Sequence, residues 1–250
     1  MDPRDNQARA SLMKSMSDLR IKIFADGADE KAIAELATNP LIKGFTTNPT
    51  LMRAAGVSDY VAFAHRVLQV VTEAPISFEV FDDGWDGMER QARKITTWGK
   101  NVFVKIPITN THGESSVQVM SRLAADGIRL NITGMTTVDQ VRKSTEALAG
   151  GPECIISVFA GRVADTGVDP VPLMCEALNV MRPHTNLELL WASPREVLNI
   201  VQADAIGCHI ITVTHDLLKK LPILGRDLAD YSLETVRMFH RDAAAARYDL

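Results

Sequence analysis

Eight short apolar segments recur along the chain, and each is followed by a segment whose apolar residues repeat with the period of a helix. Runs rich in Val, Ile and Phe that end at turn residues are typical of buried strands. Strands that alternate with helices indicate a parallel sheet, because each connection must return the chain to the same end of the sheet. The expected strands span residues 20–25, 43–47, 76–81, 101–107, 128–133, 154–159, 187–191 and 208–213.

Eight such units can form a closed barrel or an open, doubly wound sheet. An open sheet of this kind usually carries a glycine-rich nucleotide signature in its first strand-to-helix loop, whereas the loop here reads Asp26-Gly27-Ala28-Asp29. The sequence also lacks a GxxxxGK[ST] motif. A length of 250 residues matches a single barrel. The expected fold is an α/β (β/α)8 TIM barrel with an additional C-terminal helix.

The chain is expected to form a single domain over residues 1–250, because no low-complexity linker or change of composition divides it. Residues 1–19 read as a polar N-terminal arm, and residues 227–250 as a long terminal helix with an apolar stripe. Among the other expected helices, one begins at a Ser58 cap and one spans residues 193–203.

Charge and cysteine usage exclude several classes of protein. The net charge is −4, no basic block is present, and the aromatic residues do not alternate with basic ones, so we expect neither nucleic-acid nor membrane binding. Cys154, Cys175 and Cys208 are odd in number and widely spaced, and the N-terminus lacks a signal-peptide core. A reducing cytoplasm is therefore the expected compartment. The six histidines show no HExxH or paired spacing, so no metal and no cofactor are expected.

A lysine interrupts the fourth expected strand, where Lys105 lies between Val104 and Ile106. An ammonium group buried in such a strand loses its hydration, which favours the free amine. A free lysine amine in an apolar pocket is the nucleophile of Schiff-base chemistry. The alternative is a lysine at a strand end that extends its charge into solvent. For a lysine considered alone, the second interpretation is favoured.

Polar residues in or after the other strands would meet Lys105 at one face of a barrel, because the strands all end there. Asp26 could instead cap a helix, and Asn48 could belong to a simple turn. Glu79, between two apolar residues, is costly to bury unless it is paired or protonated. The converging set is Asp26, Thr46, Thr47, Asn48, Glu79, Lys105, Asn131, Thr133, Ser157, Arg162, Ser193 and Arg195.

The chain resembles the transaldolase family along most of its length. Seven segments match in order and spacing, which is far more specific than any one of them. They are Phe24-Ala-Asp26, Thr46-Thr-Asn-Pro49, Ser77-Phe-Glu79-Val80, Val104-Lys-Ile-Pro107, Asn131-Ile-Thr133, Ser157-Val-Phe-Ala-Gly-Arg162 and Ala192-Ser-Pro-Arg195.

The resemblance implies a class I enzyme that needs no metal and forms a Schiff base at Lys105. It implies that Asp26 is the acid/base at the donor hydroxyls, and that Glu79 and Thr133 hold a proton-shuttling water. The remaining residues are implied to bind substrate. Asn48, Asn131 and Ser157 would contact the dihydroxyacetone portion, Thr46 and Phe159 would line the site, and Arg162, Ser193 and Arg195 would bind the phosphate.

The implied reaction is transfer of a dihydroxyacetone unit from sedoheptulose 7-phosphate or fructose 6-phosphate to an aldose phosphate, as in the pentose phosphate pathway. Related small barrels instead cleave fructose 6-phosphate directly, and they tend to carry Gln in place of Glu79 and Tyr in place of Phe159. Direct cleavage, or a role in a specialised sugar pathway, is the alternative. A barrel that binds sugar phosphates without turnover is a second class, although it need not retain the proton-handling residues. The expected partners are small sugar phosphates and other copies of the chain in a homo-oligomer.

Overall fold

The sheet of the protein is a closed barrel in which β1 to β8 pair in parallel and in chain order, with β8 returning to β1. This computed structural model describes residues 15–248. The expected (β/α)8 barrel with a C-terminal helix is confirmed. Residues 1–14 of the expected N-terminal arm lie outside the described residues, and Met16–Asp18 form a short 3-10 helix, η1.

The strands are β1 (Lys22–Asp26), β2 (Ile42–Thr46), β3 (Ile76–Glu79), β4 (Val102–Pro107), β5 (Leu130–Met135), β6 (Cys154–Val158), β7 (Leu187–Trp191) and β8 (Ile210–Thr214). The helices that follow the strands are α2 (Glu30–Ala37), α3 (Pro49–Ala54), α4 (Tyr60–Val70), α5 (Trp85–Ile95), α6 (Val117–Ala125), α7 (Val138–Leu148), α8 (Ala160–Asp165), α9 (Pro170–Met181), α10 (Val197–Ala205) and α11 (His215–Leu218). The long helix α12 (Leu228–Ala246) ends the fold, and η2 (Thr96–Trp98) and η3 (Leu221–Ile223) are single 3-10 turns.

Alternate residues of each strand face opposite sides of the barrel wall, so the fold has two hydrophobic layers. The larger layer lies between the strands and the helices. The smaller one fills the barrel interior with Phe24, Phe103, Ile155, Leu190, Ala192 and Ile210. Gly44 makes room for this filling, because a Cβ there would come within 2.5 Å of the Phe24 ring. The interior below the polar residues is therefore a packed floor.

Several helices begin at a polar cap that the local sequence supplies. The Asp29 carboxylate accepts from the backbone N–H of Ala32 at the start of α2, so Asp29 rather than Asp26 caps this helix. The expected cap at Ser58 is displaced by one residue, since Asp59 accepts from the N–H of Ala62. A side-chain oxygen at the first position satisfies an N–H that the helix itself cannot.

Two short helices, α3 and α8, were not expected from the sequence. The helix expected over residues 193–203 begins only at Val197. Ser193 has a φ of +60°, a left-handed conformation that no helix tolerates, and it precedes Pro194. Residues 193–196 therefore form a loop between β7 and α10.

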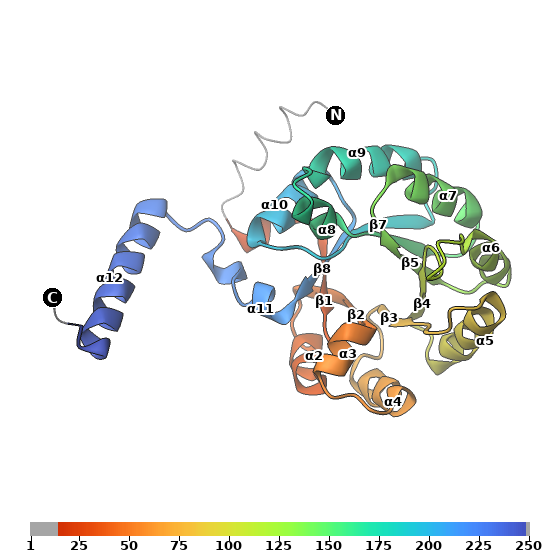
Figure 1. The fold of residues 1–250 in the computed structure, drawn as a ribbon, viewed down its shortest axis with the longest axis horizontal. Helices are drawn as coiled ribbons and strands as arrows, with labels where there is room; N and C mark the ends of the chain where they lie inside the picture. Colours follow the sequence, from red (N-terminus) through yellow and green to blue (C-terminus); the bar gives the residue numbers. More distant parts are fainter. Residues whose placement is uncertain (1–14, 249–250) are drawn as a thin grey trace.

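The C-terminal helix α12 extends away from the barrel (Figure 1). It is 19 residues long, and none of its residues is buried. Its exposed apolar side chains include Leu228, Tyr231, Val236 and Phe239. In the part of the chain that the structure describes, no helix is both long enough and apolar enough to span a membrane.

Candidate active site

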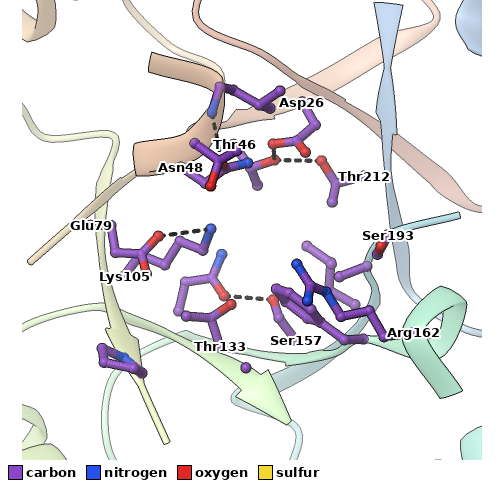
Figure 2. A pocket seen from close by; sticks show the side chains of 18 of the residues that line it. Asp26, Thr46, Asn48, Glu79, Lys105, Thr133, Ser157, Arg162, Ser193 and Thr212 are labelled. Carbon is purple, nitrogen blue, oxygen red and sulfur yellow. Dashed lines mark hydrogen bonds and ion pairs between the residues drawn. The ribbon is translucent and has the colours of Figure 1, made fainter. Parts of the chain in front are cut away.

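A cavity of about 740 Å³ opens where the strands end, and it collects side chains from all eight of them and from the loops that follow. All twelve of the candidate catalytic and substrate-binding residues line it. They are Asp26, Thr46, Asn48, Glu79, Lys105, Asn131, Thr133, Ser157, Phe159, Arg162, Ser193 and Arg195. Figure 2 shows Lys105 and Glu79 on one side of a common space, and Arg162 and Ser193 across from them.

Lys105 is buried in the cavity wall and does not extend into solvent. Its side chain is 8% exposed, which rules out the strand-end interpretation. The Nζ atom donates a hydrogen bond to the carbonyl oxygen of Thr47 at 3.0 Å and lies 3.1 Å from Oε2 of Glu79. Glu79 and Lys105 are register partners in β3 and β4, so the barrel itself places the carboxylate beside the amine.

Asp26 is the last residue of β1, and its side chain lines the cavity beside Thr46 and Thr212 (Figure 2). The Thr46 hydroxyl donates to Asp26 Oδ1 at 2.7 Å, and this hydroxyl lies 2.5 Å from that of Thr212. When Asp26 is ionised, the Thr46 proton is committed to the carboxylate, and Thr212 then donates to Thr46. Burial raises the pKa of the Asp26 carboxyl above its ordinary value of 3.8, against smaller lowering effects of the Lys105 charge and the Thr46 hydrogen bond.

Asn131 and Ser157 form a hydrogen-bonded pair, and Asn131 is the register partner of Lys105. Ser157 Oγ donates to Asn131 Oδ1 at 2.6 Å, and Asn131 Nδ2 donates to Ser77 Oγ at 2.9 Å. All three side chains are buried. These bonds orient the amide, and its second Nδ2 hydrogen is available to a ligand.

Thr133 carries a hydroxyl that is buried but finds no hydrogen-bond partner among the described residues. It lines the cavity two residues beyond Asn131 on β5. A buried hydroxyl left unpaired costs about 1–3 kcal/mol. The Thr133 hydroxyl therefore favours binding of a small polar group, such as a water molecule or a substrate hydroxyl.

The side chain of Asn48 is divided between two tasks. Its Oδ1 accepts from the N–H of Leu51 at 2.9 Å and caps α3, which starts at Pro49. The interpretation of Asn48-Pro49 as a simple turn is therefore wrong. The Asn48 side chain also lies close enough to Asp26 to lower the pKa of its carboxyl group.

The opposite wall of the cavity is basic. The Arg162 guanidinium, on α8, lies 5.5 Å from the centre of the Phe159 ring. Arg195 comes from the loop after β7 and forms an ion pair with Asp165, its Nε donating to Oδ1 at 3.0 Å. Ser193, in the same loop, completes a group of two guanidiniums and a hydroxyl. Such a group suits a phosphate, because arginine donates to phosphate oxygens in pairs.

Three groups in this network were not identified from the sequence as functional: the Thr47 carbonyl, the Ser77 hydroxyl and the Thr212 hydroxyl. Ser77 and Thr212 each lie two residues before the last residue of a strand. The alternation of faces along a strand could have indicated them, since Glu79 and Thr214 line the cavity. His215 begins α11 and is not part of the cavity lining. Within residues 15–248, no group of three or more His, Cys, Asp or Glu side chains is arranged to hold a metal ion.

Comparison with known proteins gives consistent matches along the chain. The family model described as Transaldolase/Fructose-6-phosphate aldolase matches residues 23–250. A probable transaldolase of Roseiflexus castenholzii is 37% identical over 215 residues, which cover 86% of this chain and 94% of the relative. A probable transaldolase of Thermoanaerobacter sp. is 31% identical over 224 residues, covering 89% of this chain and 98% of the relative. A crystal structure of a protein from Burkholderia cenocepacia covers 95% of this chain and 99% of its own, with a TM-score of 0.54 and 11% identity, which shows the fold alone.

Proposed function

Because the chain belongs to the transaldolase/fructose-6-phosphate aldolase family, we propose that it transfers a dihydroxyacetone unit from a phosphorylated ketose to an aldose phosphate through a Schiff base on Lys105. The observation that carries the proposal is the environment of the Lys105 amine. It is buried at the mouth of a barrel, 3.1 Å from a carboxylate, in a cavity with a basic wall.

In the first half-reaction, Glu79 takes a proton from Nζ and the amine attacks the ketose carbonyl. The carbinolamine then loses water, for which a proton is delivered through the Glu79 carboxyl and a water held at Thr133. The resulting iminium accepts the electrons of the C3–C4 bond when that bond breaks. Asp26 takes the proton of the C4 hydroxyl, and an aldehyde leaves.

In the second half-reaction, the enamine that remains on Lys105 attacks the acceptor aldehyde. Asp26 returns its proton to the new alkoxide, and hydrolysis of the iminium frees the amine. The raised pKa of Asp26 supports this role, because a carboxyl group that takes and returns protons works best when its pKa lies closer to the operating pH. Arg162, Ser193 and Arg195 would hold the phosphate of either sugar.

Direct aldol cleavage of fructose 6-phosphate is the second candidate, because the family includes both activities. The presence of Glu79 and Phe159 favours transfer, since the cleaving enzymes tend to carry Gln and Tyr at these places. Adding erythrose 4-phosphate to protein and fructose 6-phosphate should yield sedoheptulose 7-phosphate. Release of free dihydroxyacetone at the full rate without an acceptor would instead establish cleavage.

Borohydride reduction tests the covalent step. Reduction in the presence of fructose 6-phosphate should add mass to a peptide that contains Lys105, and Lys105→Met should abolish both the adduct and turnover while leaving the circular dichroism spectrum unchanged. Lys100→Met is the matched control, because Lys100 lies on the same stretch but its side chain is 75% exposed. Failure of the wild-type protein to form an adduct with any phosphoketose would favour the non-catalytic, sugar-phosphate-binding barrel.

We also propose a homo-oligomer, in which the apolar stripe of α12 packs on a second copy of the chain. Most of the stability of a helix in a protein comes from packing of its apolar face, and none of the residues of α12 is buried against its own barrel. The cytoplasm and the pentose phosphate pathway are the proposed setting. The three free cysteines support a reducing compartment. Burial raises the pKa of the Cys154 thiol to about 11 and that of the Cys208 thiol to about 12, so both thiols resist ionisation.

A further inference from the structure

Asp165 forms a bidentate ion pair with Arg195 but does not itself line the cavity. The Arg195 Nε donates to Oδ1 of Asp165 at 3.0 Å, and its Nη2 donates to Oδ2. Asp165 ends α8, the helix that also carries Arg162, whereas Arg195 lies in the loop after β7. The pair therefore joins the two segments that supply the basic wall.

The backbone around Arg195 is held by contacts that do not involve Asp165. The Arg195 N–H donates to Asn199 Oδ1 at 2.7 Å, and the Gly161 N–H donates to the Ala192 carbonyl at 3.3 Å. Gly161 lies so close to the loop that an added Cβ would overlap the Ser193 carbonyl oxygen. Asp165 is thus left to govern the direction of the Arg195 side chain rather than the path of the loop.

A long cationic side chain at a cavity rim has many rotamers, and ordering it has an entropic cost. The Arg195 side chain is 47% exposed, so packing alone does not order it. Asp165 engages two of the five guanidinium N–H groups and leaves three. Arg162 differs, because its guanidinium lies against the Phe159 ring and, within residues 15–248, no ion pair with a carboxylate is found for it.

We propose that Asp165 is a positioning residue for phosphate recognition, which holds the free edge of the Arg195 guanidinium toward the cavity. The inference rests on the proposed function, because it assigns Arg195 to the phosphate of the sugar. Arg195 would then meet the phosphate already oriented, and substrates without a phosphate would gain nothing from Asp165.

The test compares KM and kcat for fructose 6-phosphate with those for unphosphorylated fructose in Asp165→Ala, Asp165→Asn and Asp165→Glu. We expect Asp165→Ala to raise KM for fructose 6-phosphate about twofold to fivefold, as for loss of one partly exposed ionic contact, with kcat within about twofold. The KM of Asp165→Asn should lie between those of the wild type and Asp165→Ala. Asp165→Glu, which restores a carboxylate, should have a lower KM than Asp165→Ala. Fructose kinetics should not change. Asp139→Ala is the control, since it removes an exposed ion pair with Lys143 on α7.

A double-mutant cycle decides whether Asp165 acts through Arg195. In an Arg195→Ala background, Asp165→Ala should have no further effect. An unchanged or lower KM in Asp165→Ala, an equal rise for fructose, or a rise that persists without Arg195 would each overturn the inference. Titration of fructose 6-phosphate into Lys105→Met, with and without Asp165→Ala, gives the same comparison as a binding measurement. Loss of affinity there would support the role of Asp165 even if borohydride trapping of the wild type failed.

Discussion

At the scale of single residues, burial of the Asp26 carboxyl group has opposite consequences for chemistry and for folding. A base must be ionised, so activity should fall on the acid side at a pH above the ordinary carboxyl pKa of 3.8. For folding, the raised pKa means that the folded state resists ionisation more than the unfolded chain does. Below pH 3.8 the group is protonated in both states. As pH rises through the folded-state pKa, stability is lost.

We predict that Asp26→Asn raises the melting temperature at pH 7 relative to wild type, and that the gain shrinks as pH falls toward about 4. Asp83→Asn serves as a comparison of opposite sign, because hydrogen bonds from Thr111 lower the pKa of the exposed Asp83 carboxyl. It should slightly lower the melting temperature at pH 7. Calorimetric scans across pH would detect both effects. A melting-temperature gain for Asp26→Asn that is equal at all pH values would contradict the assigned cause.

Substitution of Thr133 should also affect stability and activity in different ways. Thr133→Val removes a buried hydroxyl that lacks a partner among residues 15–248, so the free energy of unfolding should stay equal or increase. If this hydroxyl holds the proton-carrying water, kcat should fall by about 10²-fold or more. Thr145→Val is the matched control, because Thr145 on α7 is another buried hydroxyl that has no hydrogen-bond partner in the described part of the chain, but it lies outside the cavity. Its kcat should not change.

Where a polar group interrupts an apolar strand, as Lys105 and Glu79 do, the sequence indicated a side chain that the structure places in the cavity lining. It left open whether Lys105 is buried, because that depends on closure of the barrel around it. Asp165 shows a different limit. Its partner Arg195 is 30 residues away, and only the packing of α8 on the loop after β7 brings the two together.

At the scale of elements, helices that bury a periodic apolar stripe were predictable, while α3 and α8 were not. Each has six residues, fewer than two turns, and so presents too few positions for a period to appear. The start of α10 was misplaced for a related reason. A Ser-Pro sequence resembles a helix start, but Ser193 adopts a left-handed conformation where the loop packs on Gly161.

If the apolar stripe of the exposed helix α12 holds an oligomer together, charged residues on that stripe should weaken the assembly. Val236→Glu combined with Phe239→Glu places two charges on its apolar stripe, so light scattering should show a smaller assembly than wild type. Arg241→Glu is the control, since it changes the net charge by the same amount without removing an apolar side chain. A wild-type monomer at working concentration would contradict the proposed oligomer. An unchanged assembly in the double variant would place the contact elsewhere.

At the scale of the whole molecule, the barrel was predictable because alternation of strands and helices has few solutions for eight parallel strands. The registers between strands could not be read from the sequence, since they depend on how neighbouring side chains pack across the wall. Those registers place Glu79 beside Lys105 and Lys105 beside Asn131. The chemistry of the site thus depends on pairings between segments that are distant in sequence.

The packed floor of the barrel has a kinetic consequence. Phe24, Phe103, Ile155, Leu190 and Ile210 are each at most 5% exposed, so the cavity has no exit through the barrel axis. The aldehyde released from the donor and the acceptor aldehyde must therefore pass through the same opening at the mouth of the barrel, one after the other. For the proposed transfer, reciprocal plots of rate against donor concentration at several acceptor concentrations should therefore give parallel lines. Intersecting lines would mean that both sugars are bound at the same time. They would contradict a mechanism in which the first aldehyde leaves before the second one enters.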